Sequence, residues 1–270
     1  MSAIPMSAVP MSKPPIPQPD RLPDLADRVV VVTGASRGIG YFTALHAASA
    51  GAHVVAVART VGGLEDLDDA IRANGRGGAT LVPLDLTDGP GVDRLGAAVN
   101  ERWRRCDAMI ANAGVLGTIS PIGHIEAKTF EAVMAVNVTA VWRLARTLDP
   151  LLQRTQGSRA LLVSSGAAHS CKPYWGAYAA SKAATEALAR VWARETANGP
   201  LRVNCVNPGA TRTQMRAKAV PGEDADTLPE PSDVGRAMVG LLDPSIERTG
   251  QIYDVRAGRW LEYAMPEAAS

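Results

Sequence analysis

The chain has 270 residues, with 28 lysines and arginines against 27 aspartates and glutamates, and 46% of it is hydrophobic. That length can bury the core of one large α/β domain or of two small ones. The near-zero net charge argues against a dedicated nucleic-acid-binding protein. No apolar run approaches the roughly 20 residues that cross a bilayer. A disordered, collagen-like or coiled-coil chain is also excluded for the bulk of the sequence.

Residues 1–25 form a proline-rich segment that opens with a short Met-Ser-x-x-Pro repeat. Proline lacks an N–H donor and fixes φ, so neither a helix nor a central strand is expected here. The prolines also interrupt the apolar run that a secretory signal needs. We expect a disordered tail, with an arm docked on a neighbouring subunit as the alternative. A second tail is expected at 261–270.

Between residues 26 and 260, apolar strands alternate with helical stretches, without a linker. The first strand, 29–32, is a run of four valines, which is typical of a strand buried on both faces of a parallel sheet. Six further strands are predicted at 53–57, 79–84, 108–110, 159–164, 201–206 and 251–255. Helices are predicted at 39–50, 62–74, 88–105, 129–154, 177–197 and 232–242. This alternation predicts right-handed crossovers in a single α/β domain with a doubly wound sheet.

The three cysteines, Cys106, Cys171 and Cys205, lie far apart and have no CxxC spacing. An odd and sparse set is typical of reduced thiols in the cytoplasm rather than of a disulfide framework. We therefore expect a cytoplasmic protein, and we expect neither a metal site nor a membrane or nucleic-acid partner.

A glycine-rich turn connects the first strand to the first helix. Its glycines, Gly34, Gly38 and Gly40, follow a GxxxGxG spacing rather than the better-known GxGxxG. Glycine lets the backbone approach a pyrophosphate, and the helix N-terminus offers unpaired N–H donors. The position directly after a buried strand favours a dinucleotide site over a tight turn with packing glycines.

The end of the second strand indicates which dinucleotide binds. An acidic residue at this place would accept hydrogen bonds from a ribose 2′-hydroxyl and repel a 2′-phosphate. The sequence here is Val57-Ala58-Arg59-Thr60, and Arg37 lies in the glycine loop itself. Two guanidinium groups fit a 2′-phosphate, although both arginines could instead be solvated surface residues. We expect NADP(H) to be preferred, with NAD(H) possible.

Tyr178 and Lys182 are four residues apart and so lie on one face of the predicted 177–197 helix. A nearby ammonium favours the phenolate and lowers the pKa of a tyrosine, which prepares it for acid–base chemistry. Ser165 follows the fifth strand at the edge of the sheet where ligands bind, and could hold a substrate oxygen. Tyr-x-x-x-Lys alone is weak evidence, because an ordinary surface pair has the same spacing.

Several motifs occur in order at matching strand ends: TGASRGIG, Asn112-Ala113-Gly114, Asn137, Ser165, YAASK and Asn207-Pro208-Gly209. Together they resemble the short-chain dehydrogenase/reductase family over nearly all of 27–255. The resemblance implies a single Rossmann-like domain with a seven-stranded parallel sheet. It also implies hydride transfer between NAD(P) and a carbonyl or alcohol, and a homodimer or homotetramer packed through the long helices.

The resemblance assigns roles to individual residues. The expected catalytic residues are Ser165, which orients substrate, Tyr178 as general acid/base, Lys182, which holds the nicotinamide ribose, and Asn137, which supports a water in a proton relay. Asp85 resembles the residue that binds adenine, although a buried helix asparagine and a helix cap are the plain alternatives for Asn137 and Asp85. The full expected cofactor set is Gly34, Ser36, Arg37, Gly38, Ile39, Gly40, Arg59, Asp85, Leu86, Asn112, Ala113, Gly114, Tyr178, Lys182, Pro208, Gly209, Thr211 and Thr213.

The leading hypothesis is a cytoplasmic NADPH-dependent carbonyl reductase or alcohol dehydrogenase. The loop 167–175 is expected to form a wall of the substrate pocket, and 209–229 a lid whose arginines, Arg212 and Arg216, meet an anion or are merely solvated. Two alternatives remain open: an epimerase or dehydratase that retains its nucleotide, and a non-catalytic NADP(H)-binding regulator. The intact Ser165, Tyr178 and Lys182 set argues against the regulator.

Overall fold

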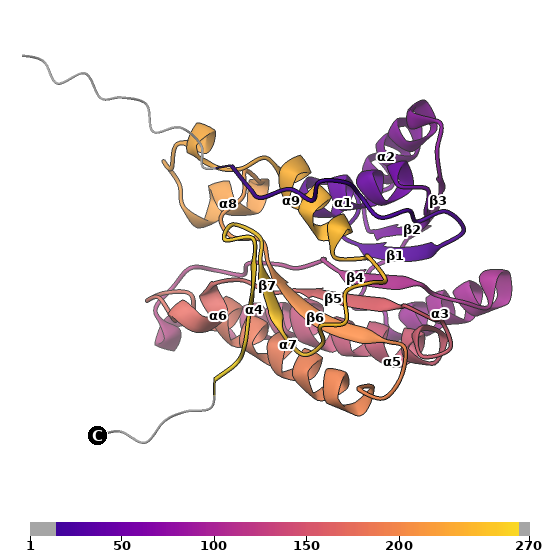
Figure 1. The fold of residues 1–270 in the computed structure, drawn as a ribbon. Helices are drawn as coiled ribbons and strands as arrows, with labels where there is room; N and C mark the ends of the chain where they lie inside the picture. Colours follow the sequence, from indigo (N-terminus) through magenta and orange to yellow (C-terminus); the bar gives the residue numbers. More distant parts are fainter. Residues whose placement is uncertain (1–14, 265–270) are drawn as a thin grey trace, which may run out of the picture.

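The computed structural model describes residues 15–264, and its centre is an eight-stranded sheet in the order β3-β2-β1-β4-β5-β6-β7-β8 (Figure 1). Seven strands pair in parallel, and β8 runs antiparallel to β7. The strands are β1 Val29–Thr33, β2 His53–Ala58, β3 Gly78–Pro83, β4 Ala108–Ala111, β5 Arg159–Val163, β6 Arg202–Asn207, β7 Ile252–Asp254 and β8 Arg259–Leu261.

Helices cover both faces of the sheet (Figure 1). One face carries α1 (Gly38–Ser49), α2 (Val61–Asn74) and α9 (Pro231–Gly240). The other carries α3 (Gly89–Trp103), α5 (Ala140–Leu152) and α7 (Gly176–Glu195), with α4 (Ala127–Met134) packed on α7. Short helices lie in the connections: α6 (Ala167–Ser170), α8 (Gln214–Ala219), and the 3₁₀ turns Ile122–His124 and Ala225–Thr227.

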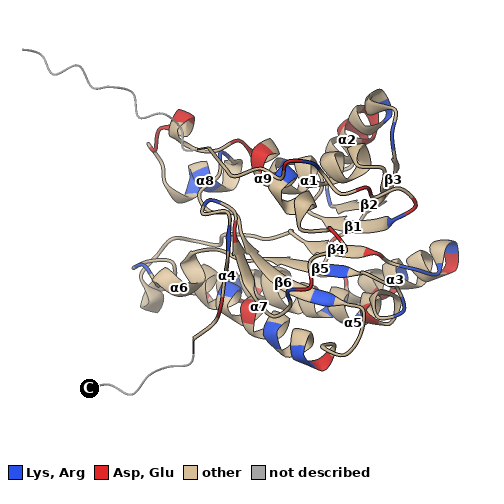
Figure 2. Ribbon diagram, in the orientation of Figure 1, with Lys and Arg blue, Asp and Glu red and all other residues tan. Residues whose placement is uncertain are grey.

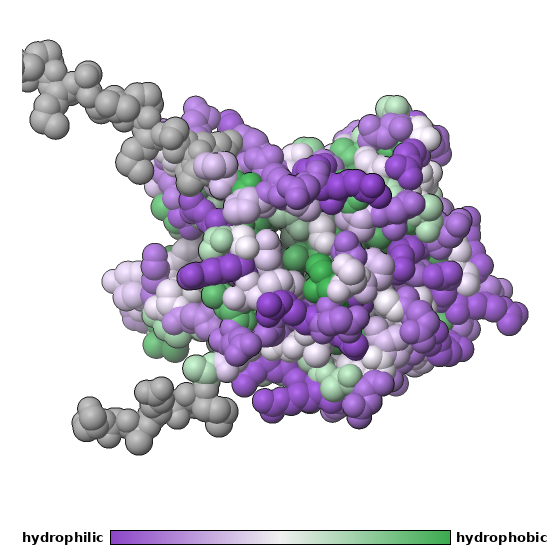
Figure 3. Space-filling model, in the orientation of Figure 1, coloured by the Kyte–Doolittle hydropathy of each residue, from purple (hydrophilic) through white to green (hydrophobic). Residues whose placement is uncertain are grey.

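The four valines of β1 explain why two helical layers can pack on one sheet. Alternate side chains of a strand point to opposite faces. Val30 and Val32 join the apolar cluster under α1, α2 and α9, whereas Val29 and Val31 join the cluster under α3 and α5. The face of the molecule drawn in Figure 3 is mostly hydrophilic, with its most hydrophobic group of residues near the middle. The predicted doubly wound α/β domain is confirmed.

The expectation of seven parallel strands needs one correction, because the sheet has an eighth strand. β8 has only three residues and pairs in antiparallel register with β7, where Trp260 lies opposite Tyr253. The two rings meet edge to face, with centroids 5.1 Å apart. So short a strand has no detectable periodicity, which is why the sequence pattern does not predict it.

The predicted long helix 129–154 is interrupted. A π-helical turn, Ala135–Thr139, separates α4 from α5 and contains Asn137. Such turns often mark functional positions, because they re-aim side chains within a continuous helix.

The terminal segments extend the domain beyond the expected tails. Residues 1–14 and 265–270 lie outside the described residues, but the indigo segment after residue 14 crosses α9 and α1 (Figure 1). Ile16 is 7% exposed, and Gln18 donates a hydrogen bond to the Asp233 carbonyl at 3.1 Å. Extended proline-rich chain can bury apolar side chains without ladder hydrogen bonds. At the other end, Tyr263 packs against His169, so the ordered fold continues past residue 260.

Candidate active site

The glycine loop between β1 and α1 lies beside β4, where the strand order reverses. This reversal is the point at which open α/β sheets bind ligands. Gly34 and Gly38 have φ angles of +67° and +58°, which side chains rarely adopt. A Cβ on Gly40 would lie 2.3 Å from both the Gly34 carbonyl and the Asn112 amide nitrogen. The loop therefore requires glycine at all three positions.

Asn112 braces this loop. Its Nδ2 donates to the Thr33 carbonyl at 2.9 Å, and its own main-chain N–H donates to the Thr33 hydroxyl at 3.1 Å. The Ala113 N–H donates to the same hydroxyl. The family resemblance places Asn112 beside the adenosine ribose, and in the structure its amide also holds the glycine loop against the end of β4.

The N-terminus of α1 can accept an anionic group. Its cap residue, Arg37, is extended and makes no side-chain capping bond, so the first N–H groups of the helix remain available. Thr213 faces the same loop, because a Cβ on Gly38 would lie 3.6 Å from its methyl group. Open N–H donors and a loop that lacks side chains at three positions together fit a dinucleotide pyrophosphate.

Arg59 and Asp85, expected in separate roles, form one pair. Arg59 Nη1 lies 3.7 Å from Asp85 Oδ2, and the arginine side chain is 64% exposed. Hydrogen bonds from the N–H and hydroxyl of Thr87, aided by Arg59, lower the pKa of Asp85 below its usual range. Arg37 is also exposed, and Leu86 is buried beside Asp85. Both guanidinium groups are thus open to an incoming phosphate.

Ser165, Tyr178 and Lys182 come together at the carboxyl end of β5. The Ser165 hydroxyl lies close enough to the Tyr178 phenol to lower its pKa. The Lys182 ammonium lies 5.7 Å from the centre of the Tyr178 ring and donates to the Val163 carbonyl at 2.7 Å. Gly114 completes the group, because a Cβ there would lie 3.6 Å from Lys182 Nζ.

The electrostatics differ from the expectation that Lys182 lowers the pKa of Tyr178. Burial raises the pKa of the phenol, and Ser165 is the group that opposes the rise. Burial also lowers the pKa of Lys182 to about 8, despite the acidic character of Glu186 and Cys205 nearby. Loss of hydration thus outweighs the attraction expected between the two groups.

Asn137 is fully engaged in this region. Its Oδ1 accepts from the Val115 N–H at 2.8 Å, and its Nδ2 donates to the Val115 carbonyl and the Ser181 hydroxyl, each at 2.9 Å. Its main-chain carbonyl accepts from the Thr185 hydroxyl. The π-helical turn thereby joins the segment after β4 to α7, the helix that carries Tyr178 and Lys182.

The Asn207-Pro208-Gly209 motif follows β6 and lies next to the loop after β5. Asn207 accepts from the N–H groups of Gly166 and Gly209 at 3.0 and 3.1 Å, which ties the loops after β5 and β6 together. Pro208 and Thr211 are buried beside Gly209, and Thr213 caps α8.

In the predicted lid, Arg216 pairs with Glu223 at 2.6 Å, and Arg212 lies 3.3 Å from Asp226.

A buried polar cluster, which the sequence does not predict, lies beneath the site. Glu186, one turn after Lys182, accepts from the Ser164 hydroxyl at 2.5 Å and lies 3.0 Å from His169 Nε2. Cys205 and Tyr263 belong to the same cluster, where burial raises the pKa of Cys205 to about 12. Sequence pattern alone does not reveal it, because glutamate at helical spacing is ordinarily solvated.

Among residues 15–264, no group of three or more histidine, cysteine or acidic side chains could hold a metal ion. In the same range, no helix is long and apolar enough to cross a membrane.

Comparison with known proteins agrees with this architecture. The profile of the short chain dehydrogenase family matches residues 28–224. The uncharacterized oxidoreductase YciK of Escherichia coli K12 is 37% identical over 238 residues, covering 87% of this chain and 94% of YciK. A chloroplastic NADPH-dependent aldehyde reductase-like protein of Arabidopsis thaliana is 29% identical over 255 residues, covering 87% and 94% of the two chains.

Among solved structures, a protein of Escherichia coli CFT073 assigned to the short-chain dehydrogenases was determined in complex with NADPH. It superposes with a TM-score of 0.81 at 37% identity, covering 86% of this chain and 98% of the other. The family profile, these relatives and the site geometry agree. The chain belongs to the short-chain dehydrogenase family of oxidoreductases.

Proposed function

We propose that this protein is an NADP(H)-dependent carbonyl reductase or alcohol dehydrogenase, with Tyr178 as general acid/base. The observation that carries the proposal is the grouping of Ser165, Tyr178 and Lys182 at the carboxyl end of β5, beside the glycine loop. A nicotinamide dinucleotide bound in that loop would supply or accept the hydride. The NADPH complex of one relative and the aldehyde reductase name of another support this assignment.

In the direction of reduction, Tyr178 would donate its phenolic proton to the substrate oxygen while Ser165 hydrogen-bonds to that oxygen. The raised pKa of Tyr178 keeps the phenol protonated at neutral pH, which is the form that a proton donor needs. Lys182 would bind the nicotinamide ribose and supply a positive charge beside the phenol. Asn137 would position α7 and support the water that returns a proton.

The adenosine end supports a preference for NADP(H). Arg37 and Arg59 are exposed at the mouth of the glycine loop, where a 2′-phosphate would lie. Guanidinium groups bind phosphate through paired, charge-assisted hydrogen bonds. Asp85 would share Arg59 with the phosphate, so NAD(H) remains a weaker alternative cofactor. The expected contacts of Ser36, Ile39, Leu86, Ala113, Pro208, Gly209 and Thr211 with the cofactor belong to the same proposal.

The substrate would be a carbonyl compound with an apolar body. Trp175 packs against Tyr178, with ring centroids 6.0 Å apart. Tyr174 is 57% exposed and Ile122 is 82% exposed, and their segments join where Ser120 donates to the Tyr174 carbonyl. Exposed apolar groups next to a catalytic residue favour an apolar ligand.

We further propose a cytoplasmic homo-oligomer. Trp142 of α5 and Val191 of α7 are 45% and 56% exposed, and they lie on the helices through which packing is expected. The free cysteines support a reducing compartment.

The test is to follow NADPH oxidation with a panel of aldehydes, ketones and quinones, using wild-type protein and Tyr178→Phe. We expect Tyr178→Phe to lower kcat by at least 100-fold, the contribution typical of a general acid, while NADPH affinity changes little. Retained turnover in Tyr178→Phe would refute the acid/base assignment. A parallel loss of NADPH affinity would mean that Tyr178 is instead a cofactor-binding residue.

A further inference from the structure

A second concave site lies at the opposite end of the sheet from Ser165. It is a cavity of about 610 Å³ at the amino ends of β5 and β6. Three arginines line it, Arg28, Arg159 and Arg202, together with one acidic residue, Glu247. Figure 2 shows basic residues at the starts of both strands. Nothing in the catalytic site uses these residues.

Arg159 is the unusual member of this set. The residue is 2% exposed, and its guanidinium contacts main-chain carbonyls of Ser158, Asp243 and Ile246 at 2.8, 3.1 and 2.8 Å. Its buried Nε has no hydrogen-bond partner within residues 15–264, and no carboxylate of that range lies within ion-pair distance. A guanidinium stays charged at physiological pH, and a buried charge without a counter-ion is costly.

The neighbouring charged side chains do not balance the positive charge of Arg159. Burial lowers the pKa of Arg159, and the repulsion of Arg202 and Arg28 adds to the effect, against the attraction of Glu247 and Asp243. Arg202 is already saturated: its Nε and Nη2 bind Glu247, and its Nη1 binds the Gly199 carbonyl. Asp243 and Glu247 lie near enough to attract Arg159, but neither forms an ion pair with it, so its positive charge is only partly compensated.

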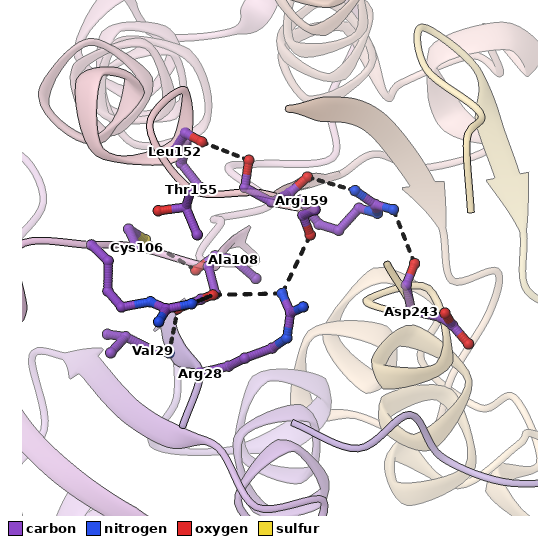
Figure 4. Close-up of polar contacts among 12 residues, drawn as sticks. Arg28, Val29, Cys106, Ala108, Leu152, Thr155, Arg159 and Asp243 are labelled. Atoms are coloured by element: carbon purple, nitrogen blue, oxygen red, sulfur yellow. Dashed lines mark hydrogen bonds and ion pairs between the residues drawn. The ribbon is translucent and has the colours of Figure 1, made fainter. Parts of the chain in front are cut away.

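Arg28 provides the accessible donors. Its Nη1 lies 3.5 Å from Asp107, a carboxylate that also binds Arg105 and the Val29 N–H. Its Nε and Nη2 make no hydrogen bond within the described part of the chain. Figure 4 shows Arg28 beside the segment that leads to Arg159, where its Nη1 reaches the Gly157 carbonyl.

Gly157 keeps this cavity open. Its φ is +68°, and a Cβ there would lie 2.9 Å from Pro244 and 3.8 Å from Arg28 Nη2. Any side chain at this position would thus be strained and would crowd the free edge of the Arg28 guanidinium.

We propose that this cavity binds a phosphate group, either free phosphate or a small organic phosphate. Arg28 would contact the oxygens with its free Nε and Nη2, and the negative charge would compensate Arg159. The planar guanidinium edge matches the geometry of a phosphate. A phosphate dianion also balances the positive charge of the arginines better than a single carboxylate does. The site is separate from the cofactor loop, so this inference does not depend on the proposed function.

The experiment measures thermal stability and binding heat with inorganic phosphate against chloride at equal ionic strength. Four proteins are compared: wild type, Arg28→Gln, Arg59→Asp and Arg154→Gln. Arg154 is a matched control, because its guanidinium lies at the same end of the molecule but binds Pro150 and Asn100 instead of lining the cavity. Arg28 is partly exposed and is not in the buried core, so Arg28→Gln is expected to fold.

We expect phosphate, but not chloride, to stabilise the wild type, and Arg28→Gln to weaken phosphate binding about tenfold or more. Arg59→Asp and Arg154→Gln should bind phosphate as the wild type does. Unchanged binding in Arg28→Gln, or equal effects of phosphate and chloride, would overturn the proposal. Loss of binding in Arg59→Asp would overturn it as well, because phosphate would then occupy the cofactor loop. Glycerol 2-phosphate is the second arm: tighter binding than inorganic phosphate identifies an organic phosphate as the occupant, and weaker binding identifies the free ion.

Discussion

Lys182 holds an ammonium group in a buried position beside Tyr178, where burial lowers its pKa to about 8 from an unfolded value of 10.5. A lowered lysine pKa means that folding disfavours the charged form. The unfolded chain therefore binds more protons between pH 8 and 10.5, and stability rises with pH across that window. Below pH 8, burial of the charged ammonium lowers the free energy of unfolding by its full amount, about 3 kcal/mol.

Lys182→Met should therefore raise the free energy of unfolding at pH 7, by up to about 3 kcal/mol, although the variant is expected to lose activity. Its advantage over the wild type should decline from pH 8 and vanish near 10.5. Denaturant unfolding of both cofactor-free proteins between pH 7 and 10 measures this difference. A variant less stable than the wild type at pH 7 would mean that the bond from Lys182 to the Val163 carbonyl outweighs burial.

The positions of some site residues could be predicted from the sequence, whereas the burial of others could not. Ser165, Tyr178 and Lys182 could be predicted to converge, because strand ends and helical spacing fix their positions. Glu186 and Arg159 could not, since a charged residue is ordinarily exposed and burial follows from packing that no local pattern encodes. In the cofactor-free protein the pKa of Tyr178 is raised rather than lowered, for the same reason. Proximity can be inferred from spacing, whereas loss of hydration cannot.

At the scale of elements, the glycine loop depends on the missing Cβ of Gly40. A methyl group there would lie 2.3 Å from the Gly34 carbonyl and from the Asn112 amide nitrogen. Neither the Gly34 backbone nor the hydrogen-bonded Asn112 side chain can move freely. Gly40→Ala should destabilise the fold by about 1–3 kcal/mol and weaken NADPH binding.

Gly62→Ala is the matched control. Gly62 lies in the first turn of α2, and a Cβ there would meet no atom within 4 Å. Alanine at a helical position with free space should stabilise by about 0.5 kcal/mol. Thermal unfolding of the two variants measures both effects. If Gly40→Ala proved as harmless as Gly62→Ala, the close approach of α1 to β4 would not be a requirement of the loop.

Long elements could be predicted and short ones could not. The valine run of β1 and the amphipathic helices carry enough residues for their period to be read. β8 has three residues and α6 has four, so neither has a period. The π-helical turn at Asn137 is a local change of winding within a continuous apolar pattern, and the sequence there resembles an uninterrupted helix.

At the scale of the whole molecule, the described N-terminal segment packs on α9 and connects it to other parts of the domain. Ile16 is buried, Pro19 lies against Gly240, and Pro17 lies against Gly258 near β8. Composition alone suggested a tail, because prolines exclude regular elements. It could not indicate that the same prolines pack on a surface made by distant parts of the chain.

Ile16→Ala should lower the free energy of unfolding by about 2 kcal/mol, since a buried isoleucine loses most of its apolar contact. Ile122→Ala, at a position 82% exposed, should change it by less than about 0.5 kcal/mol. Denaturant unfolding of the full-length proteins gives both values. Equal small effects would mean that the segment does not stabilise the domain.

The central claim is that this short-chain dehydrogenase uses NADP(H), bound at the glycine loop with Arg59 at the 2′-phosphate. The most direct test is a fluorescence titration of wild type and Arg59→Asp with NADPH and NADH. We expect the wild type to bind NADPH more tightly, and Arg59→Asp to weaken NADPH binding by about 10–100-fold while NADH affinity changes little, because only NADPH carries the phosphate that a carboxylate repels. A wild type that prefers NADH, or a ratio of the two dissociation constants that Arg59→Asp leaves unchanged, would contradict the claim.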